Sequence, residues 1–266
     1  MNILLITSCN RIKQTLLSLS LNAQTIKQKF SVVIVDSSTP NEQEDSIINT
    51  LHSDDPYNTV NNFNYCSDVN LLETSHQFFP NIEEFKVIHF TPRLTKQRGE
   101  STSIALGLMQ AAIMGNRQNP REKNFCLKLT GTSILKWDVV SELPSYLSNS
   151  DVLTWHRANI GGYERSTRIF GCRPEILSNI IAQRGWYDWC DDNSGVLEQR
   201  FAKIIENDLP DRVNYTGNDE NGMLLEGGMA MQQSYGRERI NNFIKQNNID
   251  TNATPYLRAF MNGELW

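Results

Sequence analysis

The sequence lacks the short motifs by which several large enzyme classes are known. It has no G-x-G-x-x-G turn after its first predicted strand, where the chain reads SCNR, so a nicotinamide-dependent dehydrogenase is not expected. It also has neither G-x-x-x-x-G-K-[ST] nor G-x-S-x-G. These two absences exclude a P-loop nucleotidase and a serine hydrolase with a nucleophile elbow.

Cysteine and histidine are scarce and scattered. The five cysteines, at positions 9, 66, 126, 172 and 190, form no C-x-x-C pair. Their odd number favours reduced, mostly buried thiols in a cytosol-like compartment. The four histidines form no H-x-H or H-x-x-E pattern and no cluster with cysteine. This spacing excludes a preformed zinc site.

Long apolar runs and an excess of positive charge are also missing. No run approaches the roughly 20 apolar residues of a membrane-spanning helix, and the opening MNILLITSC is too short for a secretory leader. A net charge of −5 gives no bulk attraction for nucleic acid or anionic lipid. We therefore expect no nucleic-acid partner and a cytoplasmic protein, or one of the host cytoplasm if the chain is viral; peripheral membrane contact stays open.

Apolar runs and helical stripes alternate along the first half of the 266-residue chain. Strands are expected at Asn2–Ser8, Ser31–Asp36, Lys86–Phe90 and Phe125–Leu129, with helices over 11–27 and 101–114. This alternation predicts an α/β fold with a doubly wound, mostly parallel sheet and helices on both faces. In such sheets, ligands bind beyond the carboxyl ends of the strands.

The second half continues with shorter elements. Helices are expected over 139–147, 175–183, 196–205 and 237–246, and strands over 151–155, 167–172 and 212–216. The polar stretch 41–84 predicts one helix near 42–51. No repeat and no clear linker interrupts the chain, which favours a single domain with a C-terminal extension.

The order of the polar turns gives the clearest likeness to a known family. One strand ends in TSCNR and the next in VDSST; then come a helix reading RGESTSIALGLMQAA and a strand that feeds a polar loop. Over about residues 1–140 this combination resembles the GT-A glycosyltransferases, specifically the family-2-like inverting enzymes. The resemblance implies a GT-A-like domain at 1–216, with a nucleotide-sugar half at 1–140 and an acceptor half at 141–216. Residues 217–266 would form a lid or extension.

The resemblance places the donor nucleotide at the ends of the first strands. By it, Asp36 would accept hydrogen bonds from uracil or ribose. The other residues that it assigns to the nucleotide are Thr7, Ser8, Asn10, Lys96, Arg98 and Gly99. From the sequence alone, Asp36 could also simply end a strand and begin a turn, Arg98 could be a solvated loop charge, and Gly99 could be only a turn.

The main departure from the family lies in the stretch FCLKLTGTSILKWD, residues 125–138. GT-A enzymes usually carry Asp-x-Asp here to hold Mn²⁺ or Mg²⁺ against the donor diphosphate. This chain carries KLTG, similar to a subset of bacterial and viral polysaccharide glycosyltransferase-like proteins. Three interpretations stay open. Lys128, with Thr130, replaces the cation as a point charge; other groups hold the metal, with Asp138 and His156 as candidates; or Lys128 is a buried charge paired with an acid.

An inverting transfer needs one carboxylate to take the proton of the acceptor hydroxyl. In the family, that acid opens a helix after an aromatic, glycine-containing loop, which here reads GWYDWCDDNSGVLEQRF. Glu198 matches the register best, with Asp191 and Asp192 as alternatives. An acid at a helix start is also favoured by the helix dipole, which is the structural alternative for Glu198. The acceptor sugar would stack on the aromatic residues of this loop, Trp186, Tyr187 and Trp189.

The sequence therefore predicts transfer of a hexosyl or pentosyl group, with inversion, from a nucleoside-diphosphate sugar to a carbohydrate in polysaccharide or glycan synthesis. A requirement for Mn²⁺ or Mg²⁺ stays open, and a homodimer is compatible with the sequence. Two other functions are retained. One is a non-catalytic relative that binds a sugar nucleotide or glycan, favoured by the missing Asp-x-Asp. The other is a sugar nucleotidyltransferase, whose usual glycine-rich loop is absent from SCNRIK.

Overall fold

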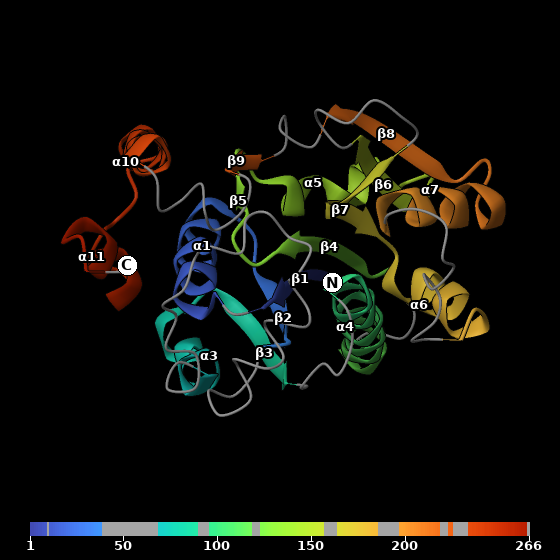
Figure 1. Cartoon of the computed structure of the whole chain (residues 1–266), viewed down its shortest axis with the longest axis horizontal. Helices are drawn as coiled ribbons and strands as arrows, with labels where there is room; N and C mark the ends of the chain where they lie inside the picture. The colour runs from blue at the N-terminus through green and yellow to red at the C-terminus, as the bar shows by residue number, and fades with distance from the viewer. Residues whose placement is uncertain are drawn as a thin grey trace.

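The computed structural model describes residues 1–9, 11–38, 69–89, 96–118, 123–156, 164–185, 197–218, 223–225 and 234–264. Within these residues, a seven-stranded sheet is covered by helices on both faces (Figure 1). The α/β fold and the mostly parallel sheet predicted from the sequence are confirmed. No helix in the described part of the chain is both long and apolar enough to cross a membrane.

Strands and helices alternate as far as β4, as the sequence predicts for the first half of the chain, and the later elements come partly as successive strands or successive helices. The strands are β1 (Asn2–Ser8), β2 (Phe30–Asp36), β3 (Ile82–His89), β4 (Phe125–Thr130), β5 (Ile134–Leu135), β6 (Val152–His156), β7 (Arg165–Cys172), β8 (Val213–Asn218) and β9 (Met223–Leu225). The helices are α1 (Ile12–Thr25), α3 (Val69–Thr74), the 3-10 helix η1 (Ser75–Phe78), α4 (Lys96–Gln118), α5 (Val139–Tyr146), α6 (Pro174–Gln183), α7 (Leu197–Asp208), α10 (Ser234–Gln246) and α11 (Pro255–Met261).

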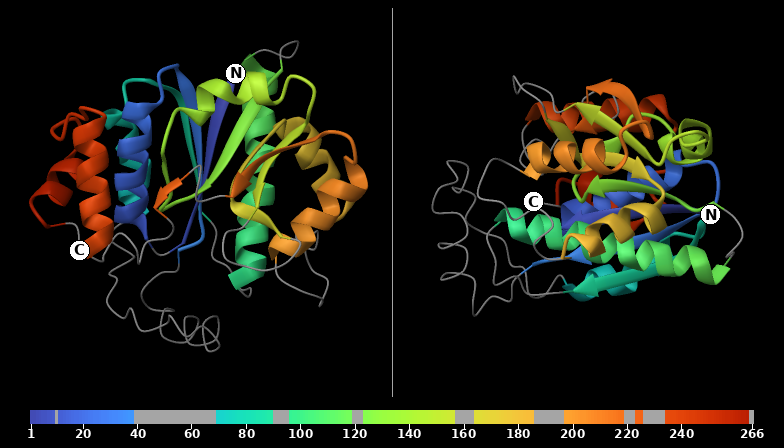
Figure 2. Two further views of the ribbon diagram at one scale, coloured as in Figure 1. Left: turned by 90° about the horizontal axis from the view of Figure 1, so that it is seen from above. Right: turned by 90° about the vertical axis from the view of Figure 1, so that its right-hand side faces the viewer.

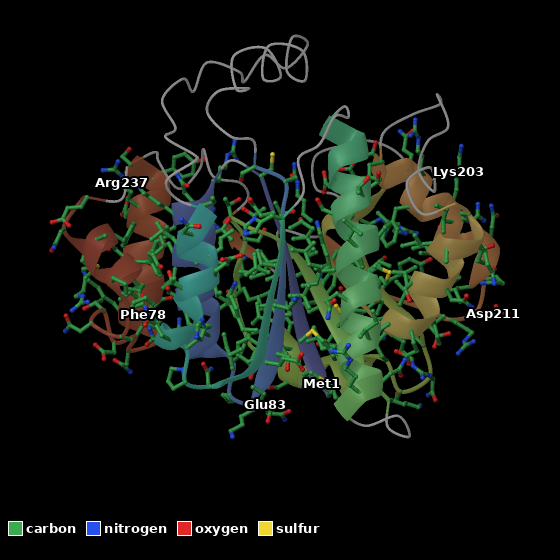
Figure 3. The ribbon with its side chains drawn as sticks, turned by 90° about the horizontal axis from the view of Figure 1, so that it is seen from below. Met1, Phe78, Glu83, Lys203, Asp211 and Arg237 are labelled. Carbon is green, nitrogen blue, oxygen red and sulfur yellow. The ribbon has the colours of Figure 1, made fainter. Side chains whose placement is uncertain are left out.

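The strand order in the main sheet is β3-β2-β1-β4-β7-β6-β8. The first four strands in that order are parallel, β7 is antiparallel to both of its neighbours, and β6 and β8 are parallel to each other. Within this sheet, every strand except β7 therefore points the same way. Their carboxyl ends share one edge, opposite the edge that Met1 and Glu83 mark in Figure 3.

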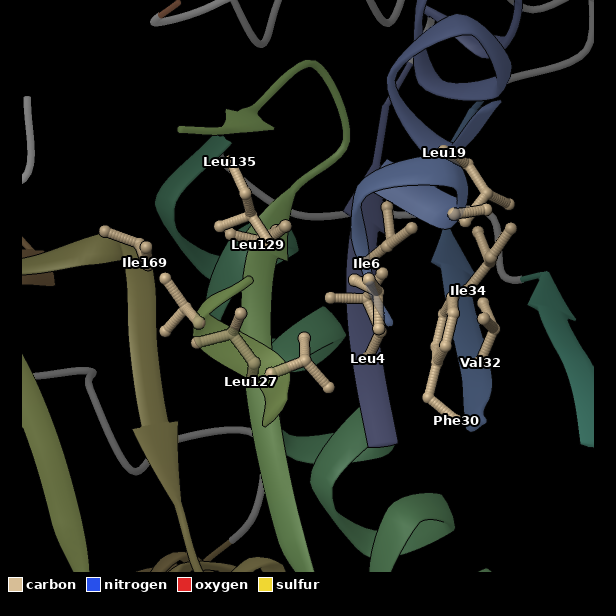
Figure 4. Close-up of a cluster of buried hydrophobic side chains, with 14 of the residues drawn as sticks. Leu4, Ile6, Leu19, Phe30, Val32, Ile34, Leu127, Leu129, Leu135 and Ile169 are labelled. Atoms are coloured by element: carbon tan, nitrogen blue, oxygen red, sulfur yellow. The ribbon is translucent and has the colours of Figure 1, made fainter. Parts of the chain in front are cut away.

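Alternate residues of the central strands face two separate core layers, as the two-residue period of a strand requires. Figure 4 shows the layer on the side of α1 and α5, and its labelled members on the strands of the main sheet are Leu4, Ile6, Phe30, Val32, Ile34, Leu127, Leu129 and Ile169. The intervening residues, such as Leu5 and Val33, face α4, α6 and α7. Both faces being covered explains why β1 and β2 are buried along their whole length.

Small residues recur at every fourth position of α4, which makes a stripe along one side of the helix. The stripe consists of Gly99, Ser103, Gly107, Ala111 and Gly115, all buried. A Cβ atom on Gly107 would lie 2.2 Å from the side chain of Leu5 on β1. The stripe therefore lets α4 lie closer to the sheet than larger side chains would allow.

The helices of the C-terminal extension pack on α1 (Figure 2). A third hydrophobic cluster joins Leu17 and Leu21 on the outer side of α1 to Ile240 of α10 and Leu257 of α11. The Oγ1 of Thr254 also lies 3.0 Å from the hydroxyl oxygen of Ser20 on α1. As a result most residues of α1 are buried, including polar ones such as Ser18 and Ser20.

Some boundaries differ from those predicted. The polar stretch 91–101 was expected to be a loop, but α4 already begins at Lys96, and β3 begins four residues before Lys86. Gly99 does not break the helix because it belongs to the small stripe that packs inward. The short elements α3, η1, β5, β9 and α11 were not predicted, and the helix expected near 42–51 lies outside the described residues.

Candidate functional site

The carboxyl edge of the sheet brings several predicted site residues into one row. In the strand register, Thr130 lies beside Thr7, Ser8 beside Asp36, and Asp36 beside His89. These residues come from four different strands that are distant in the sequence. Because parallel strands end together, the row marks the edge at which α/β sheets bind ligands.

Asp36 is held firmly at this edge. Its side chain is 1% exposed. Its Oδ1 accepts a hydrogen bond from the Ser38 hydroxyl (2.8 Å), and its Oδ2 accepts one from the Ser38 amide (3.3 Å). The Nδ1 of His89 lies 3.4 Å from the same Oδ2. Asp36 therefore does end a strand and open a turn, and the contact with a nucleotide that the sequence predicts would be an addition to this local role.

The end of β1 and the turn after β4 are packed tightly together. The amide of Gly131 donates to the carbonyl oxygen of Thr7 (2.8 Å), and the hydroxyls of Ser8 and Thr15 lie 3.2 Å apart. A Cβ atom on Gly131 would lie 2.5 Å from Thr15 Oγ1 and 3.1 Å from Thr7 O. The glycine of KLTG is therefore required by space, because no side chain fits between these two groups.

Lys128 is completely buried, yet all three hydrogens of its ammonium group have partners. Its Nζ donates to the backbone carbonyl of Thr167 and to Thr130 Oγ1 (3.3 Å), and it forms an ion pair with Glu100 Oε1 (3.5 Å). An ammonium has three N–H donors, which these three partners occupy. The Thr167 hydroxyl donates to the same Glu100 oxygen (3.3 Å). This is the arrangement of the third interpretation, a buried charge paired with an acid.

Two further charged residues act on Lys128. Burial lowers the pKa of Lys128, while the carboxylates of Glu100 and Glu198 oppose that shift and Arg168 adds to it. Glu198 is half-buried in the first turn of α7, so the fold brings this predicted base into electrostatic contact with the lysine of β4. Glu100 was missed from the sequence. A buried lysine needs an acid beside it, which predicts an acidic partner for Lys128 but not which acid it is.

His156 lies at the same edge but is engaged with neighbouring side chains. Its Nδ1 lies 2.7 Å from Nη1 of Arg165, and its ring stacks on Tyr215 with the centroids 6.3 Å apart. Arg165 in turn pairs with Glu206 (3.3 Å) and lies over the Tyr215 ring. Burial, and to a lesser extent Arg165, lowers the pKa of His156, which favours the neutral ring that accepts from the guanidinium.

Asp138 lies at the opposite edge of the sheet. It caps α5, accepting from the Ser141 amide (3.0 Å) and hydroxyl (2.6 Å), and it also accepts from the amide of Lys27, just after α1 (2.7 Å). Although it is close to Thr130 in sequence, the chain turns at Gly131 and runs back along α1. It therefore does not share an edge with Lys128.

The described residues around Lys128 do not fit the divalent cation that the resemblance implies. A charged ammonium cannot be a metal ligand, and the nearest carboxylate, Glu100, is engaged by it. Across the described part of the chain, no three or more His, Cys, Asp or Glu side chains are grouped so that they could hold a metal ion.

The remaining predicted site residues lie partly or wholly outside the described part of the chain. Gly99 is buried in the first turn of α4, where its carbonyl oxygen accepts from Ser103 (2.8 Å), and the side chains of Lys96 and Arg98 beside it are outside the described part. The residues that lie wholly outside it are Asn10, Trp186, Tyr187, Trp189, Asp191 and Asp192.

No protein-family model matches the sequence, and no curated protein matches it either. Solved structures do match. A fragment of TarS from S. aureus, residues 1–349, aligns with a TM-score of 0.51 and 13% identity over 98% of this chain and 71% of that one. The chain has a GT-A-like fold. At this identity the likeness shows the fold alone.

Two other glycosyltransferases align at lower scores. GlyE from Streptococcus pneumoniae TIGR4 has a TM-score of 0.44 and 9% identity, over 96% of this chain and 53% of that one. Mouse xyloside xylosyltransferase 1 has a TM-score of 0.42 and 9% identity, over 91% of this chain and 92% of that one. The TarS fragment has also been crystallised with UDP-GlcNAc and with UDP.

Proposed function

We propose that this chain is a glycosyltransferase that moves a sugar from a nucleoside-diphosphate sugar to a carbohydrate acceptor with inversion. The observation that carries the proposal is the charged cluster on β4 of a GT-A-like sheet, where the buried Lys128 pairs with Glu100, and where the charge of Glu198 in the first turn of α7 also acts on the lysine. A candidate base, a buried cation and the strand-end acid Asp36 then share the edge where such sheets bind ligands.

The proposed reaction is a single displacement. The acceptor oxygen forms a bond to the anomeric carbon of the donor, and the bond from that carbon to the phosphate oxygen breaks. The nucleoside diphosphate leaves with the electron pair, and the acceptor proton passes to the carboxylate of Glu198. Asp191 and Asp192 remain the alternative acids, and Trp186, Tyr187 and Trp189 are the proposed acceptor platform.

For the donor, we propose that the diphosphate is bound without a metal at the Lys128 position. Because the three hydrogens of Lys128 are already engaged, the lysine acts through its positive potential rather than by a direct contact. Thr130, whose hydroxyl oxygen accepts from Lys128, is proposed to donate its own hydrogen to a phosphate oxygen. The amino end of α4 opens at the same edge and adds a partial positive charge.

The wider role that we propose is polysaccharide or glycan synthesis in the cytoplasm. The chain spans about half of GlyE and 71% of the TarS fragment, so neither protein's activity is transferred to it as a whole. Thr7, Ser8, Asn10, Lys96, Arg98 and Gly99 are proposed to surround the nucleotide.

The test is calorimetric titration of the purified protein with UDP-GlcNAc and with other UDP-, GDP- and dTDP-sugars, in Mn²⁺ and in EDTA. We expect at least one donor to bind equally well in both. Glu198→Gln should keep that affinity and lower sugar transfer about 10²- to 10⁴-fold. Glu175→Gln, which also alters an acid in the first turn of a helix, should leave transfer unchanged. NMR of the product's anomeric proton reports inversion.

Other outcomes would point elsewhere. If no donor or free nucleotide binds in either buffer, the proposal is wrong. Binding without transfer, unchanged in Glu198→Gln, would indicate a non-catalytic binding protein. Release of pyrophosphate from a nucleoside triphosphate and a sugar phosphate would indicate a nucleotidyltransferase.

A further inference from the structure

His89 ends β3 between two carboxylates that come from different elements. Its Nδ1 lies 3.4 Å from Asp36 Oδ2 on β2, and its Nε2 lies 3.7 Å from Glu73 Oε1 on α3. The side chains differ in exposure: Asp36 is 1% exposed, His89 30% and Glu73 62%. In the described part of the chain, these two carboxylates are the charged groups that face the ring.

The protonated ring suits this position better than the neutral one. A protonated imidazole donates from both nitrogens and can serve both acids, whereas a neutral ring has a single N–H. The hydrogen bond to Asp36 is the largest cause that raises the pKa of His89 above 6.5; charge attraction to Asp36 and Glu73 adds to it, and burial opposes it.

The ring also completes the hydrogen bonding of Asp36. A carboxylate offers about four acceptor directions, and Ser38 and His89 use three of them in the described structure. About one direction is then left for a donor group on a ligand. Losing the His89 bond would leave Ser38 alone to hold the carboxylate and would leave two acids facing each other without the charge between them.

We propose that His89 is a positioning residue that fixes Asp36 for the nucleoside of the donor and makes nucleotide binding weaken as the pH rises. The proposal rests on the function proposed above. The doubly protonated ring links β2, β3 and α3. Deprotonation removes the positive charge that holds Asp36 and Glu73 together, so the affinity falls as the pH passes through the pKa of His89.

The experiment has two readouts, of which the first needs no ligand. NMR titration of the imidazole protons gives the pKa of each of the four histidines, and the His89 signal is assigned from its loss in His89→Gln. We expect His89 to titrate above 6.5 and to titrate lower in Asp36→Asn. An ordinary pKa that is the same in Asp36→Asn would overturn the coupling whatever the protein binds.

The second readout is the affinity for UDP-GlcNAc, or for whichever donor binds, between pH 6 and pH 9. We expect the affinity to fall about fivefold across the titration of His89, and bound nucleotide to raise the pKa of His89 reciprocally. His89→Gln keeps a side-chain donor without a titrating charge, so its affinity should not follow this curve. His76→Gln, a control on η1 whose ring bonds a backbone carbonyl, should keep the wild-type curve.

The outcomes separate the two proposals. A pH curve that is unchanged in His89→Gln would overturn the role of His89 and leave the proposed function standing. If no nucleotide binds at any pH, both proposals are wrong, although the first readout still decides whether His89 and Asp36 are coupled.

Discussion

Lys128 carries a charge into the centre of the sheet, and Glu100 is its acidic hydrogen-bonding partner. Water is excluded from the ammonium, so the loss of that partner would leave a buried charge hydrogen-bonded only to neutral oxygens, with Glu198 as the remaining negative charge that acts on it. The two residues are unequal in this respect. Lys128 is fully buried, whereas the side chain of Glu100 is 32% exposed and can turn toward solvent.

This asymmetry gives a prediction at the scale of single residues. Glu100→Gln should lower the free energy of unfolding by about 2–3 kcal/mol, somewhat less than for a fully buried pair because Glu100 is partly exposed. Lys128→Met should cost less, because it removes the buried charge and leaves an acid that water can reach. Urea denaturation followed by circular dichroism measures both.

The double variant Lys128→Met, Glu100→Gln tests whether the two residues are energetically coupled. It should recover most of the stability that Glu100→Gln loses, since a buried ion pair is often replaced by uncharged groups at little cost. If the two losses simply add, the residues are not coupled and the ion pair has no energetic role.

From the sequence, a single residue could be recognised as a candidate site residue only where it interrupted or ended a strand pattern. Lys128 could be recognised because it interrupts an apolar run, and Asp36 because it ends one. Glu100 could not, because its partner is 28 residues away in sequence and the contact exists only once α4 lies on the sheet. Asp138 was considered as a metal ligand because it is close to Thr130 in sequence. The chain reverses at Gly131, however, and this reversal carries Asp138 to the other edge of the sheet, beside Lys27.

Among the elements, α4 combines a poor helix sequence with close packing. Its small stripe places Gly107 where even a methyl group would overlap the side chain of Leu5, which is fully buried in the core. Two effects of a substitution therefore oppose each other. Alanine is a better helix former than glycine by about 1 kcal/mol, but overpacking a core costs about 1–3 kcal/mol.

We expect overpacking to win at this position. Gly107→Ala should lower the free energy of unfolding by about 1 kcal/mol, and Gly107→Val by more, in the same denaturation assay. Asn116→Ala, at an exposed position of the same helix, tests propensity alone and should stabilise by a few tenths of a kcal/mol. A stabilising Gly107→Ala would show that α4 does not lie as close to β1 as described.

The boundaries of α4 illustrate what patterns at the element scale can and cannot give. The apolar stripe from Ile104 to Ala112 predicted the middle of the helix correctly. The first turn was assigned to a loop because it is polar and contains Gly99. That glycine is tolerated through its packing against the sheet, and packing partners are not visible in a local pattern.

For the whole molecule, the main question is whether the C-terminal helices form part of the domain. Leu257 of α11 is completely buried against α1, so a defect there should be felt by the sheet that α1 covers. We predict that Leu257→Ala lowers the free energy of unfolding by about 2–4 kcal/mol in one cooperative transition. Tryptophan fluorescence and far-ultraviolet circular dichroism should shift together.

Met261→Ala provides the comparison on the same helix. Its side chain is 50% exposed, and the change should alter stability by no more than about 0.5 kcal/mol. Two separate transitions in Leu257→Ala, with only the first one shifted, would mean that residues 234–264 unfold independently of the sheet.

At this scale the alternation of strands and helices was enough to predict the class of fold. The reversal of β7 was not predicted, because its sequence RSTRIFGC does not reveal the direction in which the strand lies between β4 and β6, to both of which it is antiparallel. The docking of α10 and α11 on α1 was likewise hidden, because the two partners are separated by most of the chain.

That docking also bears on how the protein is made. Leu17 and Leu21 emerge from the ribosome more than 230 residues before the side chains of α11 that cover them. At about 5–20 residues per second, the outer side of α1 is therefore uncovered for roughly ten to fifty seconds of translation. During this time it is a binding site for chaperones and for neighbouring nascent chains. A slower rate of synthesis should then lower the yield of native protein.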